Sequence, residues 1–214
     1  MKNFGYYFIL MACIVTVTSC AEPVKQRAKM SETNLSQQSD TITLGGGCFW
    51  CVEAVYQQLA GVISVTSGYA GGSVKNPTYR QICEGTTGHA EVIQIVYNTS
   101  VTSFKDILEV FFTVHDPTTL NRQGADVGTQ YRSVIFYNSS AQQNLALQII
   151  EQLNASGAYA SKIVTEVTPL DVFYKAENYH QNYYRLNSSE GYCRMVIQPK
   201  LEKFKKVFPD KLIK

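Results

Sequence analysis

The sequence lacks the features that would assign it to several common protein classes. Its one long apolar run covers residues 6–17, which is too short for a membrane span of about 20 residues. Charged residues make up 17% of the chain and the formal net charge is +2, a balance that does not indicate nucleic-acid binding. No internal repeat is present, and the three histidines are scattered without metal-ligand spacing. We therefore expect no nucleic acid and no metal.

The first 20 residues have the pattern of an export signal. Lys2 supplies a positive start and residues 6–17 an apolar core. The end, Val17-Thr18-Ser19-Cys20, resembles a bacterial lipobox, in which the cysteine is lipidated. We predict lipidation at Cys20, with a plain cleaved signal as the alternative. The mature protein would then lie in the periplasm or cell envelope, anchored to a membrane without spanning it. Ala21 after the cysteine favours the outer membrane in a Gram-negative cell.

The remaining chain divides into a tether and one domain. Residues 21–40 are polar, lack aromatic side chains and show no period, which predicts a flexible segment. Residues 41–214 are enough for a single domain that buries roughly 70% of its unfolded surface and needs neither disulfide nor metal. We expect this domain to be a monomer.

Helical and strand patterns intermix along the domain. Apolar periodicity predicts strands over 40–44, 61–72, 91–98, 131–138 and 162–170. It predicts helices over 49–61, 103–117, 139–154, 176–187 and 199–208, with Ser103 and either Ser139 or Ser140 as N-caps. Three glycines end the first strand. We therefore predict an α+β fold, a two-layer α/β sandwich with a ferredoxin-like core and a mixed central sheet.

Four cysteines lie in the domain: Cys48, Cys51, Cys83 and Cys193. Export implies an oxidising compartment, so two structural disulfides are one interpretation, with three possible connectivities. A domain of this size does not need them, and Cys48 and Cys51 have the C-x-x-C spacing used in redox chemistry and in zinc sites. Cys83 and Cys193 each stand alone, so the spacing disfavours zinc. Cys48 also lies at a predicted helix N-terminus, which favours a thiolate.

Two further features predict a reaction site. In the strand 91–98, Glu91 shares its face with Ile93, Ile95 and Tyr97. A carboxyl held there in apolar surroundings would have a raised pKa and could donate a proton near neutral pH; the alternative is that it reaches water at the strand end. The polar run 115–133 is a long connection, and long loops in compact domains are often functional.

The ordered set of motifs resembles the family of peptide methionine sulfoxide reductases that act on the S epimer. The matching stretches run from 41 to about 208: "GGGCFW" followed by Glu53, "SGYAGG", "NPTY", "GTTGHAEV", "HDPTT", "RQGAD", "GTQYRS", "AENYHQNYY" and "GYC". Each short motif alone could arise by chance, whereas the set in this order is specific.

The resemblance implies a role for each matching residue. Cys48 is the nucleophile and Glu91 the acid. Phe49 and Trp50 form an apolar pocket for the substrate methyl group. Tyr79 and Tyr131 are expected to point their hydroxyls toward the sulfoxide oxygen, and Asp126 is expected to support the site. Cys193 is the expected recycling thiol, and Tyr192 before it is expected to bind substrate. No bound cofactor is implied, and a thioredoxin-like dithiol protein is the expected electron donor.

Cys51 and Cys83 are not explained by the resemblance alone. Cys51 lies one helical turn from Cys48 and is an alternative resolving thiol. We favour Cys193, because a flexible C-terminal segment can swing to the sulfenic acid. For Cys83 we expect a buried thiol.

Two other functions remain open at the level of sequence. A thioredoxin-like disulfide oxidoreductase would use Cys48 and Cys51 without needing Glu91. An anchored binding module would not be an enzyme. The preference for free or protein-bound sulfoxide does not follow from the sequence.

Overall fold

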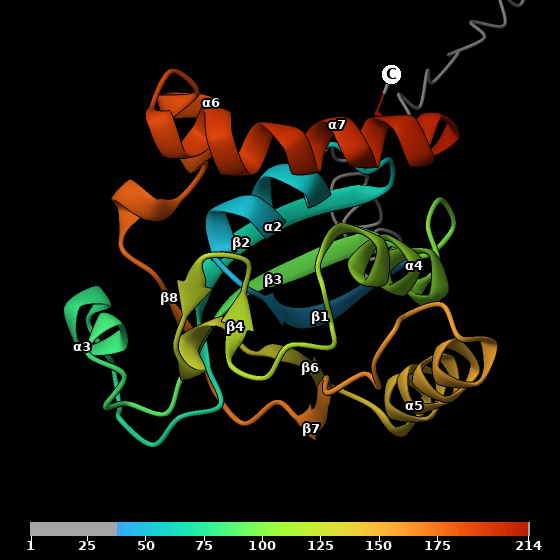
Figure 1. Ribbon diagram of the computed structural model, residues 1–214, viewed down its shortest axis with the longest axis horizontal. Helices are drawn as coiled ribbons and strands as arrows, with labels where there is room; N and C mark the ends of the chain where they lie inside the picture. The colour runs from blue at the N-terminus through green and yellow to red at the C-terminus, as the bar shows by residue number, and fades with distance from the viewer. Residues whose placement is uncertain (1–37, 214) are drawn as a thin grey trace, which may run out of the picture. The chain divides into compact units, whose positions relative to one another are not determined.

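The computed structural model describes residues 38–213 (Figure 1). The predicted signal, its Cys20 and most of the predicted tether lie outside the described residues. Strand β1 (Ser39–Gly46) already includes residues 39 and 40, so the sheet begins inside the segment expected to be the tether. Asp40 accepts a hydrogen bond from the Tyr97 hydroxyl at 2.9 Å, which ties this end of β1 to the sheet.

A six-stranded mixed sheet forms the centre of the domain, in the order β7-β6-β1-β3-β2-β8. All neighbouring pairs are antiparallel except β6 and β7, so the predicted α+β sandwich with a mixed sheet is confirmed. The other strands of the sheet are β2 (Val62–Ala70), β3 (Ala90–Asn98), β6 (Ser133–Tyr137), β7 (Glu166–Pro169) and β8 (Phe173–Lys175). Two short strands, β4 (Arg122–Gln123) and β5 (Asp126–Val127), pair separately.

Helices cover one face of the sheet. The helices are α2 (Phe49–Tyr56), α3 (Tyr79–Cys83), α4 (Phe104–Val114), α5 (Ser140–Ser156), α6 (Tyr183–Asn187) and α7 (Gln198–Val207). In Figure 1, α2 lies over the strands and α7 over α2. The main apolar core lies between these helices and the sheet. A smaller cluster on other strand residues, including Val92 and Phe136, packs against Leu170 and Phe173.

Capping residues predicted the starts of α4 and α5 correctly. The side chain of Ser103 accepts a hydrogen bond from the backbone N–H of Asp106, and the carboxylate of Asp106 accepts one from the backbone N–H of Ser103, as a capping box predicts. Ser139 caps α5, which ends at Gly157 in the left-handed conformation. Four additional short helices are 3-10 turns at Thr129–Tyr131, Asn178–His180 and Pro209–Lys211 and a π turn at Cys193–Ile197.

Several predicted boundaries were wrong. The helix predicted over 103–117 ends at Val114 and the strand predicted over 162–170 is only Glu166–Pro169; three other differences affect the site. Strand β1 continues through Gly45 and Gly46, which pair with β6, instead of ending at the glycines. Helix α2 ends at Tyr56 rather than at 61. The single helix predicted over 176–187 is broken, because Asn182 has a φ of 56° between the 3-10 turn and α6. The sequence reasoning also missed α3, β4, β5 and β8.

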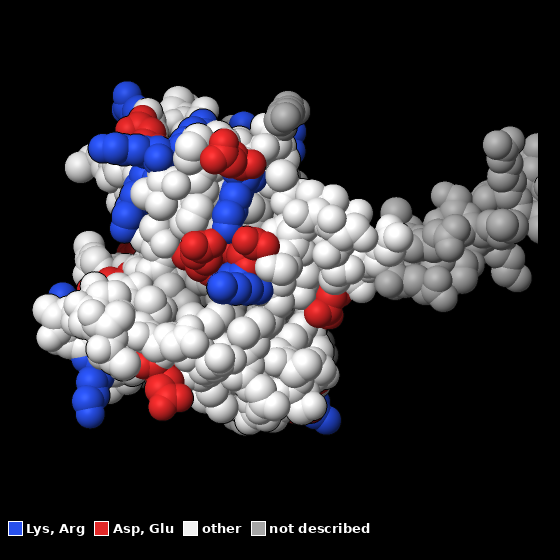
Figure 2. Space-filling model, turned by 90° about the vertical axis from the view of Figure 1, so that its right-hand side faces the viewer, with Lys and Arg blue, Asp and Glu red and all other residues white. Residues whose placement is uncertain are grey.

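Charged side chains of both signs share the surface. On the face shown in Figure 2, acidic and basic groups lie next to one another over its middle, and its lower part carries few of either. Lys211 pairs with Asp106 at 2.7 Å, which connects the C-terminal turn to α4.

Candidate active site

The three glycines bring Cys48 to the start of α2. A Cβ atom at Gly45 would come within 2.8 Å of the Val134 side chain, so only glycine lets β1 approach β6 here. Gly47 has a φ of 90°, and a Cβ there would lie 2.6 Å from the side chain of Gln123. The resulting tight turn makes Cys48 the N-cap of α2.

Cys48 is a thiol in this substrate-free form. Its side chain is only 6% exposed, and burial is the main cause that raises its pKa well above the usual value, followed by its hydrogen bond with Cys51. The expectation that the helix N-terminus makes Cys48 a thiolate is therefore wrong for this state. The loss of hydration outweighs the partial charge at the end of an eight-residue helix.

Glu91 is the buried carboxyl of the site. It lies on β3 with 1% of its surface exposed, and its Oε2 accepts the backbone N–H of Phe49 at 3.1 Å. Burial raises its pKa to about 8, although the Phe49 bond opposes the shift. At neutral pH the group is a carboxylic acid at the N-terminus of α2 and can donate a proton. The alternative, a carboxylate reaching water, is wrong.

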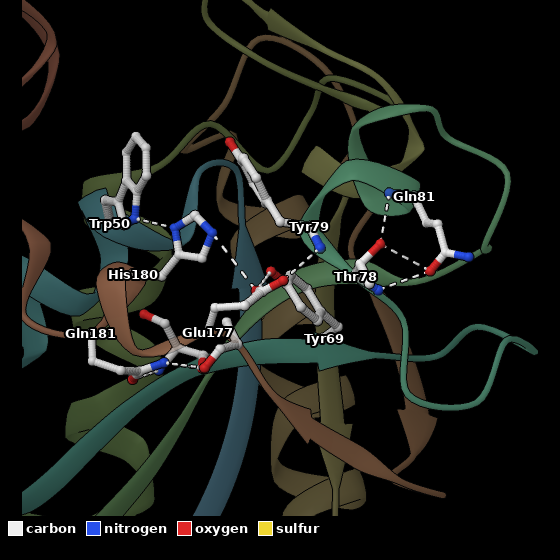
Figure 3. A network of polar contacts seen from close by, with 10 residues as sticks. Trp50, Tyr69, Thr78, Tyr79, Gln81, Glu177, His180 and Gln181 are labelled. Carbon is white, nitrogen blue, oxygen red and sulfur yellow. Dashed lines mark hydrogen bonds and ion pairs between the residues drawn. The ribbon is translucent and has the colours of Figure 1, made fainter.

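Aromatic rings surround the start of α2. Phe49 is fully buried, and the half-buried indole of Trp50 stacks on Tyr183 with the ring centroids 3.7 Å apart. The indole N–H donates to Nδ1 of His180 at 3.2 Å (Figure 3). The ring of His180 also lies 4.3 Å from that of Tyr79. Together these contacts fix the orientation of Trp50.

Glu177 holds the far side of this aromatic pocket, as Figure 3 shows. It accepts from the Tyr69 hydroxyl at 2.8 Å and from the backbone N–H of Tyr79 at 2.9 Å. Its Oε2 lies 3.8 Å from Nε2 of His180. Burial lowers the pKa of His180, so the imidazole is neutral. Since Nδ1 accepts from Trp50, the single ring proton lies on Nε2 and faces Glu177.

Tyr79 and Tyr131 provide hydroxyl donors near the acid. Both are half-buried, and burial followed by the charge of Glu91 raises the pKa of each phenol. They are therefore protonated throughout the neutral range. Tyr131 ends the 3-10 turn in the polar run 115–133, so this loop does carry predicted site residues.

The structure joins two residues that the sequence predicted separately. The Tyr192 hydroxyl donates to Oδ2 of Asp126 at 3.0 Å and lies 3.9 Å from Sγ of Cys51. Cys193, the next residue, is fully buried at the start of the π turn. The predicted nucleophile, pocket and C-terminal thiol thus belong to one contiguous apolar core around α2, and the predicted acid contacts it through the N–H of Phe49.

The other cysteine expectations need two corrections. All four cysteines of the described domain are free thiols, so the alternative of two structural disulfides is not realised in this form. Cys83, for which we expected burial, is exposed at the end of α3. The helix is only five residues long and buries Ile82, so the next side chain, that of Cys83, points away from the core.

Sequence reasoning missed Glu53 as a site residue. Its carboxylate is 0% exposed and accepts the backbone N–H groups of Asn182 and Tyr183 at 2.9 and 3.1 Å. Burial raises its pKa. By capping α6, it holds the ring of Tyr183 against Trp50. The sequence did contain a signal for this role, because a charged residue inside the apolar stripe of α2 indicates a buried carboxyl group with hydrogen-bond partners.

The described part of the chain does not form two other classes of site. Among residues 38–213, no cluster of three or more His, Cys, Asp or Glu side chains could hold a metal ion. No helix in this part of the chain is both long and apolar enough to cross a membrane.

A thiol, a neutral carboxylic acid and an aromatic pocket define a thiol-dependent oxidoreductase of the α+β class. The family model described as peptide methionine sulfoxide reductase matches residues 40–212. The peptide methionine sulfoxide reductase MsrA of Natronomonas pharaonis is 56% identical over 172 residues, which cover 80% of this chain and 97% of that protein.

Solved structures agree with this match. Mxr1 from Saccharomyces cerevisiae in reduced form has a TM-score of 0.69 at 36% identity and covers 73% of this chain and 90% of its own. Mxr1 in complex with Trx2 gives a TM-score of 0.50 at 29% identity, covering 69% and 86%. The chain therefore belongs to the peptide methionine sulfoxide reductase family. It is an oxidoreductase acting on sulfur, a peptide-methionine (S)-S-oxide reductase, as the motifs predicted.

Proposed function

We propose that Cys48 attacks the sulfur of methionine-S-sulfoxide while Glu91 protonates the departing oxygen. The single observation that supports this assignment is that Glu91, a carboxylic acid at neutral pH, accepts the N–H of Phe49, the residue that follows Cys48. The attack forms an S–S bond between Cys48 and the substrate sulfur, and the S–O bond breaks so that the protonated oxygen leaves as water. Water then attacks the Cys48 sulfur, the S–S bond breaks, and methionine leaves while Cys48 becomes a sulfenic acid. Sulfoxide and thiol thus become thioether and sulfenic acid, with no atom left over.

The surrounding residues supply the substrate contacts. Phe49 and Trp50 enclose the methyl group, which is compact and apolar, whereas the hydroxyls of Tyr79 and Tyr131 bind the polar oxygen. Cys48 must lose its proton for the attack. A sulfoxide bound beside it places a positively polarised sulfur next to the thiol, and this favours the thiolate at the moment when it is needed.

In place of Cys193, which the sequence favoured as the first resolving thiol, we infer that Cys51 forms the first disulfide and that Cys193 then receives it. Cys51 is within hydrogen-bonding contact of Cys48. The Cys51 thiolate attacks the sulfenic sulfur, the S–S bond forms, the S–O bond breaks and water leaves. Cys193 next attacks Cys51 and frees Cys48; Tyr192, the residue before Cys193, already reaches the Cys51 sulfur. A thioredoxin-like dithiol protein reduces the final disulfide.

Counting methionine released without any reductant tests this order of thiols. We expect two equivalents per chain from the unmodified protein, because the relay frees Cys48 for a second attack. Cys193→Ser should release one and end with a Cys48–Cys51 disulfide. Cys51→Ser should release one and keep the sulfenic acid on Cys48, whereas Cys83→Ser should behave like the unmodified protein. A Cys48–Cys193 disulfide formed at full rate in Cys51→Ser would contradict the inference.

The two other functions considered above are not favoured by the site. A disulfide oxidoreductase using only Cys48 and Cys51 leaves the neutral Glu91 without a role, and a binding module leaves the thiol pair without one. Family membership argues against both.

We also propose that the protein is exported and anchored by a lipid on Cys20. The support is the lipobox pattern at the end of the signal, followed by a polar segment. In a bacterial host the full chain should partition into the detergent phase of a Triton X-114 extract and give a lipid-modified N-terminal cysteine by mass spectrometry. Cys20→Ala should move it to the aqueous phase. Aqueous partition of the unmodified chain would contradict the proposal.

We expect a monomer by light scattering of the detergent-solubilised protein.

A further inference from the structure

A small void lies where α7 crosses α2. It measures about 10 Å³ and is lined by Cys51, Gly46, Phe111, His115 and Lys200, with three valines. Lys200 comes from the first turn of α7 and Cys51 from the first turn of α2. The packing of these two helices therefore places Lys200 and a buried thiol beside the same void, and the charge of Lys200 is one cause that lowers the pKa of Cys51.

Lys200 is the positive charge at this void. Among the described residues that line it, His115 is the other ionisable base. Burial lowers its pKa to about 4, so it is neutral at the pH of the reaction. The carboxyl groups that act on Cys51 are Glu91 from β3 and Asp126 from β5. Glu91 is uncharged at neutral pH, and Asp126 opposes negative charge on the thiol.

Hydrogen bonds alone do not keep Cys51 charged through the cycle. In the resting protein the bond from the Cys48 thiol is the main cause that lowers the pKa of Cys51 to about 7. That S–H group is consumed when Cys48 becomes a sulfenic acid. Tyr192 has one hydroxyl proton, and its 3.0 Å bond to Asp126 uses that proton. The cation of Lys200 is independent of both changes.

We propose that Lys200 is a positioning residue for recycling, whose ammonium group stabilises negative charge on Cys51 while it attacks the sulfenic acid on Cys48. The inference rests on the proposed role of Cys51. In this step two electrons pass from the Cys51 sulfur into the new S–S bond and the S–O bond breaks. The leaving hydroxide takes up a proton and becomes water. Lys200 acts only through its charge and does not touch the substrate.

The position of Lys200 makes it suitable for substitution. Its side chain is half-buried and also lines a wide groove of about 1040 Å³ between α4, α5 and α7. Removing its charge therefore leaves no ion buried without a partner. Lys206 lies on the same helix, is exposed, and does not line the void, which makes Lys206→Gln the matched control.

The test measures one chemical step in the full chain carrying Cys193→Ser. After one equivalent of methionine sulfoxide, quenched samples are analysed for released methionine and for the Cys48–Cys51 disulfide. Lys200→Gln should slow disulfide formation several-fold at pH 7, because loss of the cation raises the pKa of Cys51 and a rise of one unit lowers its thiolate fraction by up to about tenfold. The difference should shrink at pH 9, because a larger share of Cys51 is then ionised in both proteins. Methionine release should not change.

Three results would overturn the inference, and a further one concerns only the proposed function. Equal rates in Lys200→Gln and Lys206→Gln at pH 7, an equal slowing at pH 7 and pH 9, or no recovery in Lys200→Arg each contradict a role for the charge. If the Cys193→Ser parent itself forms no Cys48–Cys51 disulfide, the proposed role of Cys51 fails first. The two failures are thus distinguishable.

Discussion

Cys48→Ser is expected to abolish methionine sulfoxide reduction, with turnover at least roughly 10⁴-fold lower than in the unmodified protein. The hydroxyl ionises far less readily than a thiol, and an oxygen at this position cannot form the sulfenic acid or the later disulfide. The fold should be unaffected, because a side chain of nearly the same size remains at the N-cap of α2, where serine is a favoured residue.

This effect is measured as methionine released from methionine-S-sulfoxide, with dithiothreitol as the reductant of the reaction. Chromatography quantifies the methionine. Cys83→Ser is the matched control, since that thiol is exposed at the end of α3 and a serine hydroxyl can keep its hydrogen bond with Tyr79. It should keep full activity. If Cys48→Ser retained more than about 1% of the activity, or if Cys83→Ser lost as much, the assignment of the nucleophile would be wrong.

Glu91→Gln is expected to lower kcat by about 10²–10⁴-fold, the range for losing a general acid. The amide preserves the shape and can still lie beside the N–H of Phe49, but it does not transfer a proton. Because burial raises the pKa of Glu91 to about 8, the acid form is present below that pH. The activity of the unmodified protein should therefore fall as the pH rises above about 8, and the variant should lack this decrease.

Folding stability separates lost chemistry from lost structure in this variant. The pKa of Glu91 is higher in the folded state than in the unfolded chain. Its contribution to the free energy of unfolding is therefore fully present below its unfolded pKa and is lost as the pH rises through its folded pKa. Above pH 8, Glu91→Gln removes a buried carboxylate and should be at least as stable toward urea as the unmodified protein. Glu84→Gln, at an exposed ion pair with Arg80, is the control. A fully active Glu91→Gln would contradict the proposed acid.

The parts of the site that depend on local sequence were predicted from it. The capping box at Ser103 needs residues three positions apart, and the period-2 pattern of β3 placed Glu91 on the apolar face, while its burial came from the folded structure. Cys48 at the start of α2 followed from glycines next to an apolar helical stripe. In each case the physical cause lies within one element of the chain.

The parts that depend on distant contacts were missed. Glu53 caps residues 129 and 130 positions away, and Glu177 binds Tyr69 across 108 positions. A helical pattern over 176–187 gives no warning that Asn182 adopts a left-handed conformation and divides it. Such contacts depend on how β2, α2 and α6 pack together, which no single element encodes.

The charge state of Cys48 shows the same limit for chemistry. A helix N-terminus beside a cysteine favours the thiolate, and this much is visible in the sequence. The burial of the sulfur and its contact with Cys51 both come from the folded core, and they reverse the balance in the substrate-free protein.

Trapping the oxidised sulfur tests the central chemical step most directly. A chain with both Cys51→Ser and Cys193→Ser, treated with one equivalent of methionine-S-sulfoxide in the presence of dimedone, should release one methionine and carry one dimedone adduct, located on Cys48 by peptide mass spectrometry. Methionine released without an adduct on Cys48, or an adduct on Cys83 in its place, would contradict the account.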